Sequence, residues 1–116
     1  MAILTTGPIV NTPVNGVRPT QTVTIKIVNN DPVNTSTVLL EGYYLNGTRT
    51  LYVLEDFSVS PNQVITHNNY ANFDGYEFLF FIDDDIAHQT EISVWGKNAN
   101  GELVDAHRLV SSEVKF

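Results

Sequence analysis

Short stretches in which apolar and polar residues alternate run through most of this chain. Residues 22–28 read TVTIKIV, in which valine and isoleucine alternate with threonine and lysine. A period of two is typical of a strand that buries one face. Turn-forming residues separate such stretches, as in NNDP at 29–32 and Asn-Gly at 46–47. No stretch shows a convincing helical period, so the pattern predicts an all-β protein.

The turn residues divide the chain into seven predicted strands, spaced by about ten residues. Their ranges are 22–28, 36–45, 48–59, 64–66, 76–82, 90–97 and 102–110. Residues 67–75 are predicted to form a polar loop. Short strands with this spacing predict an antiparallel β-sandwich or jelly roll of seven to eight strands.

The first twenty residues differ in character from the rest. Pro8, Pro13 and Pro19 interrupt them, and proline lacks a backbone donor and fixes its own φ. We therefore predict an extended N-terminal arm over 1–20 and a single domain over 21–116. The arm is either a frayed end or a tether that lies along a neighbouring subunit.

Several strands are apolar on both faces. In residues 76–82, Phe78 and Phe80 lie on one face while Leu79 and Phe81 lie on the other. An apolar second face needs a cover, which is either the loop at 67–75 or another subunit. The predicted core residues are Val23, Ile25, Ile27, Phe78, Phe80, Val94 and Leu109.

Composition narrows the classes of partner. The chain has 116 residues, no cysteine and a formal net charge of -7. An acidic protein repels phosphate backbones and anionic lipid surfaces, so we expect neither nucleic acid nor membrane partners. The chain begins without a basic segment followed by a long apolar one, which predicts synthesis in the cytoplasm without a signal peptide.

Few motifs suggest chemistry. Asp83, Asp84 and Asp85 follow an apolar strand, and we interpret them as the charged end of an aggregation-prone segment, with calcium binding as the weaker alternative. The three histidines have no metal-site spacing. They are His67, His88 and His107. No serine lies in a nucleophile elbow, so we expect no enzyme activity and no cofactor.

Aromatic residues leave two functions open. Trp95 is predicted to point outward from its strand, where it could bind a sugar ring or anchor a protein interface. The tyrosines that could extend a sugar-binding platform are Tyr43, Tyr44, Tyr70 and Tyr76.

Residues 91–110, EISVWGKNANGELVDAHRLV, together with VTIKIVNND and NYANFDGYEFLF, resemble small uncharacterised all-β proteins of spore-forming Bacillus-type bacteria. More distantly, a proline-containing arm before a jelly roll resembles the endospore appendage subunits. That resemblance implies arms that reach into neighbouring subunits and sheets that join edge to edge in fibres. The appendage proteins carry crosslinking cysteines in the arm, and this chain has none.

Taken together, these features predict a non-enzymatic structural subunit that assembles with itself into an oligomer or fibre, deposited on a spore surface. The alternative is a carbohydrate-binding module that uses Trp95 and surface tyrosines, with a glycan as partner. The residues predicted to contact neighbouring subunits are Ile3, Ile9, Val10, Val14, Leu79, Phe81 and Trp95.

Overall fold

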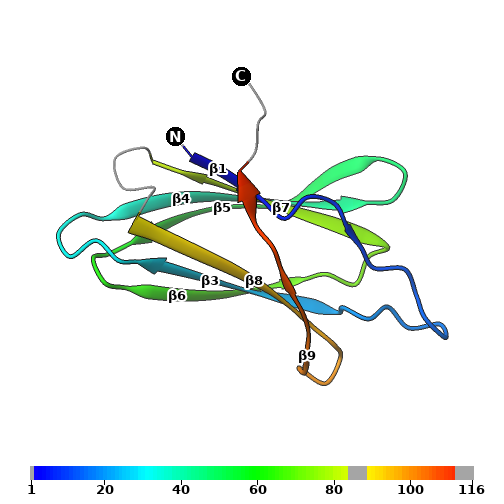
Figure 1. Ribbon diagram of the computed structural model, residues 1–116. Coiled ribbons are helices and arrows are strands. Elements are labelled where there is room, and N and C mark those ends of the chain that lie inside the picture. Colours follow the sequence, from blue (N-terminus) through cyan, green and yellow to red (C-terminus); the bar gives the residue numbers. More distant parts are fainter. Residues whose placement is uncertain (1, 84–88, 112–116) are drawn as a thin grey trace.

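A computed structural model describes residues 2–83 and 89–111, which form two antiparallel β-sheets packed face to face (Figure 1). The larger sheet has the strand order β10-β1-β7-β4-β5, with β2 also paired to β7, and the smaller sheet has the order β6-β3-β8-β9. The strands in this part of the chain are β1 (Ala2–Thr5), β2 (Ile9–Val10), β3 (Thr22–Asn29), β4 (Ser36–Leu45), β5 (Arg49–Val59), β6 (Val64–Tyr70), β7 (Gly75–Ile82), β8 (Thr90–Lys97), β9 (Leu103–His107) and β10 (Val110–Ser111).

The prediction of an all-β antiparallel sandwich is confirmed, and the jelly-roll topology stays a prediction. The described residues form ten strands rather than seven or eight. The last predicted strand, 102–110, is divided because β9 pairs with β8 in the smaller sheet while β10 pairs with β1 in the larger one. Figure 1 shows this segment crossing from one layer to the other.

The polar loop predicted at 67–75 is wrong over its first residues, because β6 continues to Tyr70. His67 pairs with Ile25 and Asn69 pairs with Val23 of the central strand β3. Backbone pairing with β3 holds this edge strand in place, although its side chains lack the apolar alternation that marks the other strands.

The core lies between the two sheets. Every core residue predicted from the sequence is buried except Leu109, which is partly buried and packs against the core. The fully buried large side chains include Tyr76, Phe78, Phe80, Ile25, Ile27, Leu40 and Ile82.

A β-bulge sets the packing of β4 against β5. Gly42 lies opposite Val53 while Tyr43 lies opposite Leu51, so Tyr52 is the extra residue. A Cβ atom on Gly42 would lie 2.9 Å from both Val53 Cβ and Phe78 Cε1. Gly42 therefore provides the space into which the opposing side chains pack.

Part of the segment predicted as an N-terminal arm pairs with its own chain. β1 and β2 both run antiparallel to β7. Pro8, Pro13 and Pro19 all lie outside these strands and are exposed, so no ladder hydrogen bond is lost to them. The chain between β2 and β3 makes a turn in which Val14 and Val17 bridge each other.

Asn11 fixes this segment to the end of the sandwich. Its side chain is buried, and its Nδ2 donates to the carbonyl oxygens of Thr20, Ala71 and Phe73 at 2.8, 3.1 and 2.9 Å. The backbone N–H of Thr20 donates in return to Asn11 Oδ1 at 2.9 Å. One side chain thus satisfies backbone groups of two separate loops.

Candidate functional site: the two outer sheet faces

The outer face of the larger sheet carries a row of apolar side chains. Because Phe78 and Phe80 point into the core, Leu79 and Phe81 point outward. The strand register places neighbouring residues on the same side, because Ile3 of β1 and Leu39 of β4 both lie opposite Phe81. We call this surface the apolar face, and it consists of Ile3, Leu39, Leu54, Leu79, Phe81 and Val110.

Exposure differs across the apolar face. Leu54, on the edge strand β5, is 60% exposed, and Val110 on β10 is 42% exposed. Leu79, on a strand flanked by β1 and β4, is only 8% exposed. Leu79 therefore forms the floor of this surface rather than its most accessible point. A hollow of about 150 Å³ lies at one end, against Leu39 and Phe81.

The loop after β6 does not cover this face. Phe73 stacks on Tyr44 with ring centroids 4.9 Å apart and meets Tyr52 and Tyr70 edge-on at 5.0 and 5.1 Å. Ala71, in the same loop, is fully buried in the core. This loop therefore closes one end of the sandwich, between the two sheets.

Arg49 and Glu77, next to the apolar face, form an ion pair within the chain. Arg49 Nε lies 3.1 Å from Glu77 Oε1, and Thr5 Oγ1 donates to the other oxygen of Glu77 at 3.2 Å. The Arg49 guanidinium also lies over the ring of Tyr43, 3.5 Å from its centroid. The Tyr43 hydroxyl donates to Glu41 at 2.7 Å, and that hydrogen bond is the main reason why the pKa of Tyr43 is raised.

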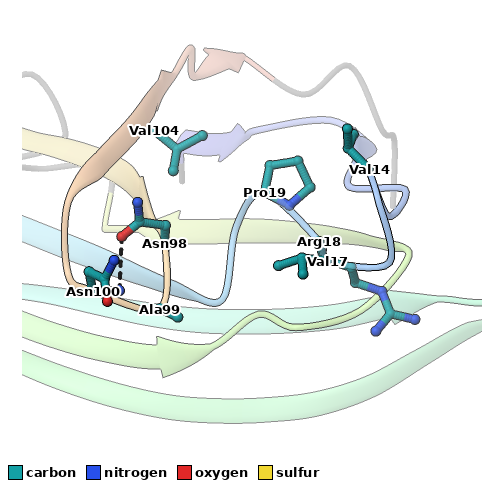
Figure 2. Close-up of a pocket in the computed structure, with 8 residues that line it drawn as sticks. All are labelled: Val14, Val17, Arg18, Pro19, Asn98, Ala99, Asn100 and Val104. Atoms are coloured by element: carbon teal, nitrogen blue, oxygen red, sulfur yellow. Dashed lines mark hydrogen bonds between the residues drawn. The ribbon is translucent and has the colours of Figure 1, made fainter.

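A second concave region lies where the N-terminal turn meets the β8–β9 hairpin (Figure 2). This groove has a volume of about 540 Å³ and is lined mainly by apolar side chains. The lining residues are Val14, Val17, Arg18, Pro19, Asn98, Ala99, Asn100 and Val104. Arg18 is held by Asp74, with Nη2 to Oδ1 at 2.8 Å, so its charge is already paired.

The structure separates the residues predicted to contact neighbouring subunits. Ile3, Leu79 and Phe81 share the apolar face, whereas Val14 lines the groove. The remaining ones lie elsewhere: Val10 is 84% exposed beside the groove segment, Ile9 packs against the core, and Trp95 lies on the smaller sheet.

Trp95 lies on the outer face of the smaller sheet, as predicted, opposite Thr24 of β3. Its indole N–H donates to Ser93 Oγ at 2.8 Å. The tyrosines do not gather around it. Tyr76 is fully buried, Tyr44 stacks on Phe73, Tyr43 lies on the opposite sheet, and Tyr70 lies on the edge strand β6.

The acidic run predicted as a calcium alternative is only partly described. Asp83 is exposed directly after β7, and Asp84, Asp85 and His88 lie outside the described residues. Within 2–83 and 89–111, no group of His, Cys, Asp or Glu side chains is arranged to hold a metal ion. The same ranges contain no helix long and apolar enough to cross a bilayer.

A buried polar pair connects the two sheets. Tyr76 of β7 and His107 of β9 are hydrogen-bonded, with hydroxyl oxygen to Nε2 at 2.6 Å. Burial lowers the pKa of His107, and the Asp105 carboxylate, whose Oδ2 lies 3.9 Å from Nδ1, opposes that shift. Burial also raises the pKa of Tyr76. Gly96 leaves the space for this pair, since a Cβ there would lie 3.3 Å from His107 Nε2.

We predict that this pair makes the fold less stable in mild acid. The unfolded chain takes up a proton on His107 at its ordinary pKa of about 6.5, whereas the folded chain resists protonation. The free energy of unfolding should therefore fall as the pH drops below that value and level off below the lowered folded pKa. Urea unfolding across this range, compared between the parent and His107→Gln, measures the effect.

The variant His67→Gln serves as the control for that experiment, because His67 is the other histidine that the structure describes. A parent and a His107→Gln variant with the same pH dependence would contradict the prediction.

Comparison with protein-family models, curated proteins and solved structures gives no match for the chain. The site is therefore defined by its own geometry. Sequence reasoning missed Leu39, Leu54 and Val110 on the apolar face. Leu39 and Leu54 lie in runs that are apolar on both sides, which is the signal that could have identified them.

Proposed function

We propose that the protein is a non-enzymatic structural subunit that associates with further copies of itself through the apolar face. The observation that carries the proposal is that all five strands of one sheet path bring apolar side chains to this face, with the polar residues Glu41 and Thr5 among them, while the other side of the sheet already forms the core. Apolar side chains gathered on an exposed sheet face usually mark an interface.

A second copy is the occupant that fits best. Two sheets pack face to face at a spacing of about 10 Å, and a twofold axis can bring the same face of two copies together. Loss of water would leave the Glu77 charge paired with Arg49, while Glu41 would keep its charge and the hydrogen bond that it accepts from the neutral Tyr43 hydroxyl. Asp56, on β5, is exposed and would lie at the rim.

Whether the assembly is closed or fibrous depends on whether an edge strand of the larger sheet pairs with another copy. β5 is the edge strand opposite β10 and is the longest strand that the structure describes, over Arg49–Val59. An unpaired edge of this length could add a strand from another copy and extend the sheet. Deposition of the assembly on a spore surface belongs to the same proposal and rests on the sequence resemblance alone.

The test is the variant Leu54→Glu, because Leu54 is the most exposed residue of the apolar face. Each copy would bring a charge into the contact and lose one buried leucine, which weakens association by about a hundredfold or more. The unfolding free energy of the single chain should change by no more than about 0.5 kcal/mol, since the side chain is already exposed. Light scattering over a wide range of concentration gives the mass.

The matched control is Val64→Glu. Val64 is 53% exposed on the smaller sheet, and its substitution adds the same charge. The proposal predicts that Val64→Glu assembles like the parent while Leu54→Glu is monomeric. The proposal of self-association would be contradicted by a parent that is monomeric at every concentration. A Leu54→Glu variant that assembles like the parent would also contradict it.

A further inference from the structure

The smaller sheet carries an unusual concentration of positive charge for so acidic a chain. The sequence has only six Lys and Arg residues, against thirteen Asp and Glu. Lys26 on β3 and Lys97 on β8 both lie on the outer face of this sheet, on either side of Trp95. Among the described residues neither lysine forms an ion pair, whereas Arg18 and Arg49 do.

These residues together form a shallow pocket. It has a volume of about 220 Å³ and is lined by Thr24, Lys26, Trp95, Lys97 and Leu103. The indole N–H is already bonded to Ser93, so the ring can present its apolar surface to a ligand without leaving a donor unpaired. The pocket thus combines one aromatic surface with two free ammonium groups.

The surroundings of the pocket are mostly polar, with one carboxylate, Glu91 of β8, on the same outer face. Thr22, Thr66 and Asn68 lie on the same outer face, on β3 and β6. The Thr24 hydroxyl donates to Asn68 Oδ1 at 2.7 Å, which fixes the Asn68 amide in place. Hydroxyl and amide groups in such an arrangement suit a ligand that carries many hydroxyls.

The register also sets the length of the ligand. Lys97 lies opposite Thr22, four residues along β3 from Lys26, so the two lysine positions are separated by about 13 Å along the strand direction. Trp95, opposite Thr24, lies between them. That separation exceeds one sugar ring, so two or more acidic sugar units are needed to reach both lysines.

We propose that this face binds a short stretch of an acidic glycan built from uronic acids. One pyranose ring would stack on Trp95, with its weakly positive C–H groups against the negative face of the indole. Carboxylates of the units on either side would pair with Lys26 and Lys97. An inorganic polyphosphate is the poorer ligand, because it has no ring that could stack on Trp95.

This site lies on the opposite side of the sandwich from the apolar face, so it does not depend on the proposed self-association. The monomeric Leu54→Glu variant should bind the glycan as well as the parent does. The two proposals can therefore fail separately.

Trp95 is the only tryptophan in the chain, so its fluorescence reports binding directly. The protein is titrated with trisaccharides of galacturonic acid and of mannuronic acid, and with a hyaluronan tetrasaccharide, up to millimolar concentration. Their methyl-esterified forms test the role of charge, and uridine monophosphate is the competing anionic ring. We expect at least one of the uronate oligomers to shift the Trp95 emission saturably, more tightly than its ester or the nucleotide, and less tightly as salt rises.

The variant that tests the site is Lys26→Gln combined with Lys97→Gln. It should bind the same oligomer about tenfold more weakly, because two partly exposed charge pairs are lost. Arg108→Gln is the matched control, since Arg108 is exposed, is unpaired among the described residues and lies outside the pocket. It should bind like the parent, and circular dichroism should show that both variants are folded.

Three results would overturn the proposal. They are the absence of any emission change with all uronate oligomers, equal or tighter binding of the esters or the nucleotide, and a double lysine variant that binds as tightly as the parent.

Discussion

An Asn11→Asp variant should lose about 4 kcal/mol of unfolding free energy at neutral pH. The two side chains have the same shape, but the carboxylate would place a negative oxygen where Nδ2 now donates to the carbonyl oxygens of Thr20, Ala71 and Phe73. All three carbonyls would lose the bond from Nδ2 and face a buried charge, although Ala71 would still accept from the Phe73 backbone N–H. The total stability of a domain this size is about 5–15 kcal/mol, so the loss is a large part of it.

The pH dependence of this loss in unfolding free energy identifies the buried carboxylate charge as its cause. The new carboxyl would have its pKa raised above the ordinary value of about 3.9 in the folded state, because its charged form is disfavoured there. The loss should therefore be smaller below that ordinary value and grow as the pH rises through the raised folded pKa. Urea unfolding measures this loss at several pH values at which the variant remains folded.

The control is Asn46→Asp, which makes the same charge change at an exposed hairpin turn where Asp-Gly also fits. It should change the unfolding free energy by about 0.5 kcal/mol or less. Equal stability of the Asn11→Asp variant and this control would show that Asn11 does not hold the N-terminal segment in place.

Replacing Gly42 by valine should cost about 3 kcal/mol or more. Its first new carbon atom would already lie 2.9 Å from Val53 Cβ and Phe78 Cε1, and neither can move freely, because Phe78 is fully buried in the core. Gly42→Ala should show a smaller loss of the same sign. Thermal and urea unfolding of both variants gives the graded effect.

Thr37→Val is the comparison for those two variants, because it introduces the same side chain at an exposed position of the same strand. It should leave stability within about 0.5 kcal/mol of the parent. Unchanged stability of Gly42→Val would mean that the bulge in β5 relaxes at no cost, and the account of this contact would be wrong.

The core and most strands could be predicted because their signal is local. Val23, Ile25 and Ile27 alternate with polar residues, and the structure buries all three. The turns were equally readable, since Asn46-Gly47 connects β4 and β5 as the dipeptide suggests, with Gly47 at a φ of 92°. Local side-chain chemistry was sufficient in both cases.

The strands β6 and β1 could not be predicted from the local side-chain pattern. His67–Tyr70 form a strand because β3 pairs with them, and Ala2–Thr5 do so because β7 offers a free edge beside them. Neither partner is close in sequence. Backbone pairing between distant segments leaves little mark on the side-chain pattern of a short strand.

For the candidate sites, too, some features follow from the local sequence and others only from the tertiary structure. The sequence by itself determined that the protein is acidic and all-β, that it has two-faced strands, and that Trp95 points outward, because composition and a period of two are properties of neighbouring residues. Only the tertiary structure decided which apolar residues form one surface and that Lys26 and Lys97 flank Trp95 while the tyrosines do not. Those relations depend on strand order and register, which are set by contacts between residues far apart along the chain.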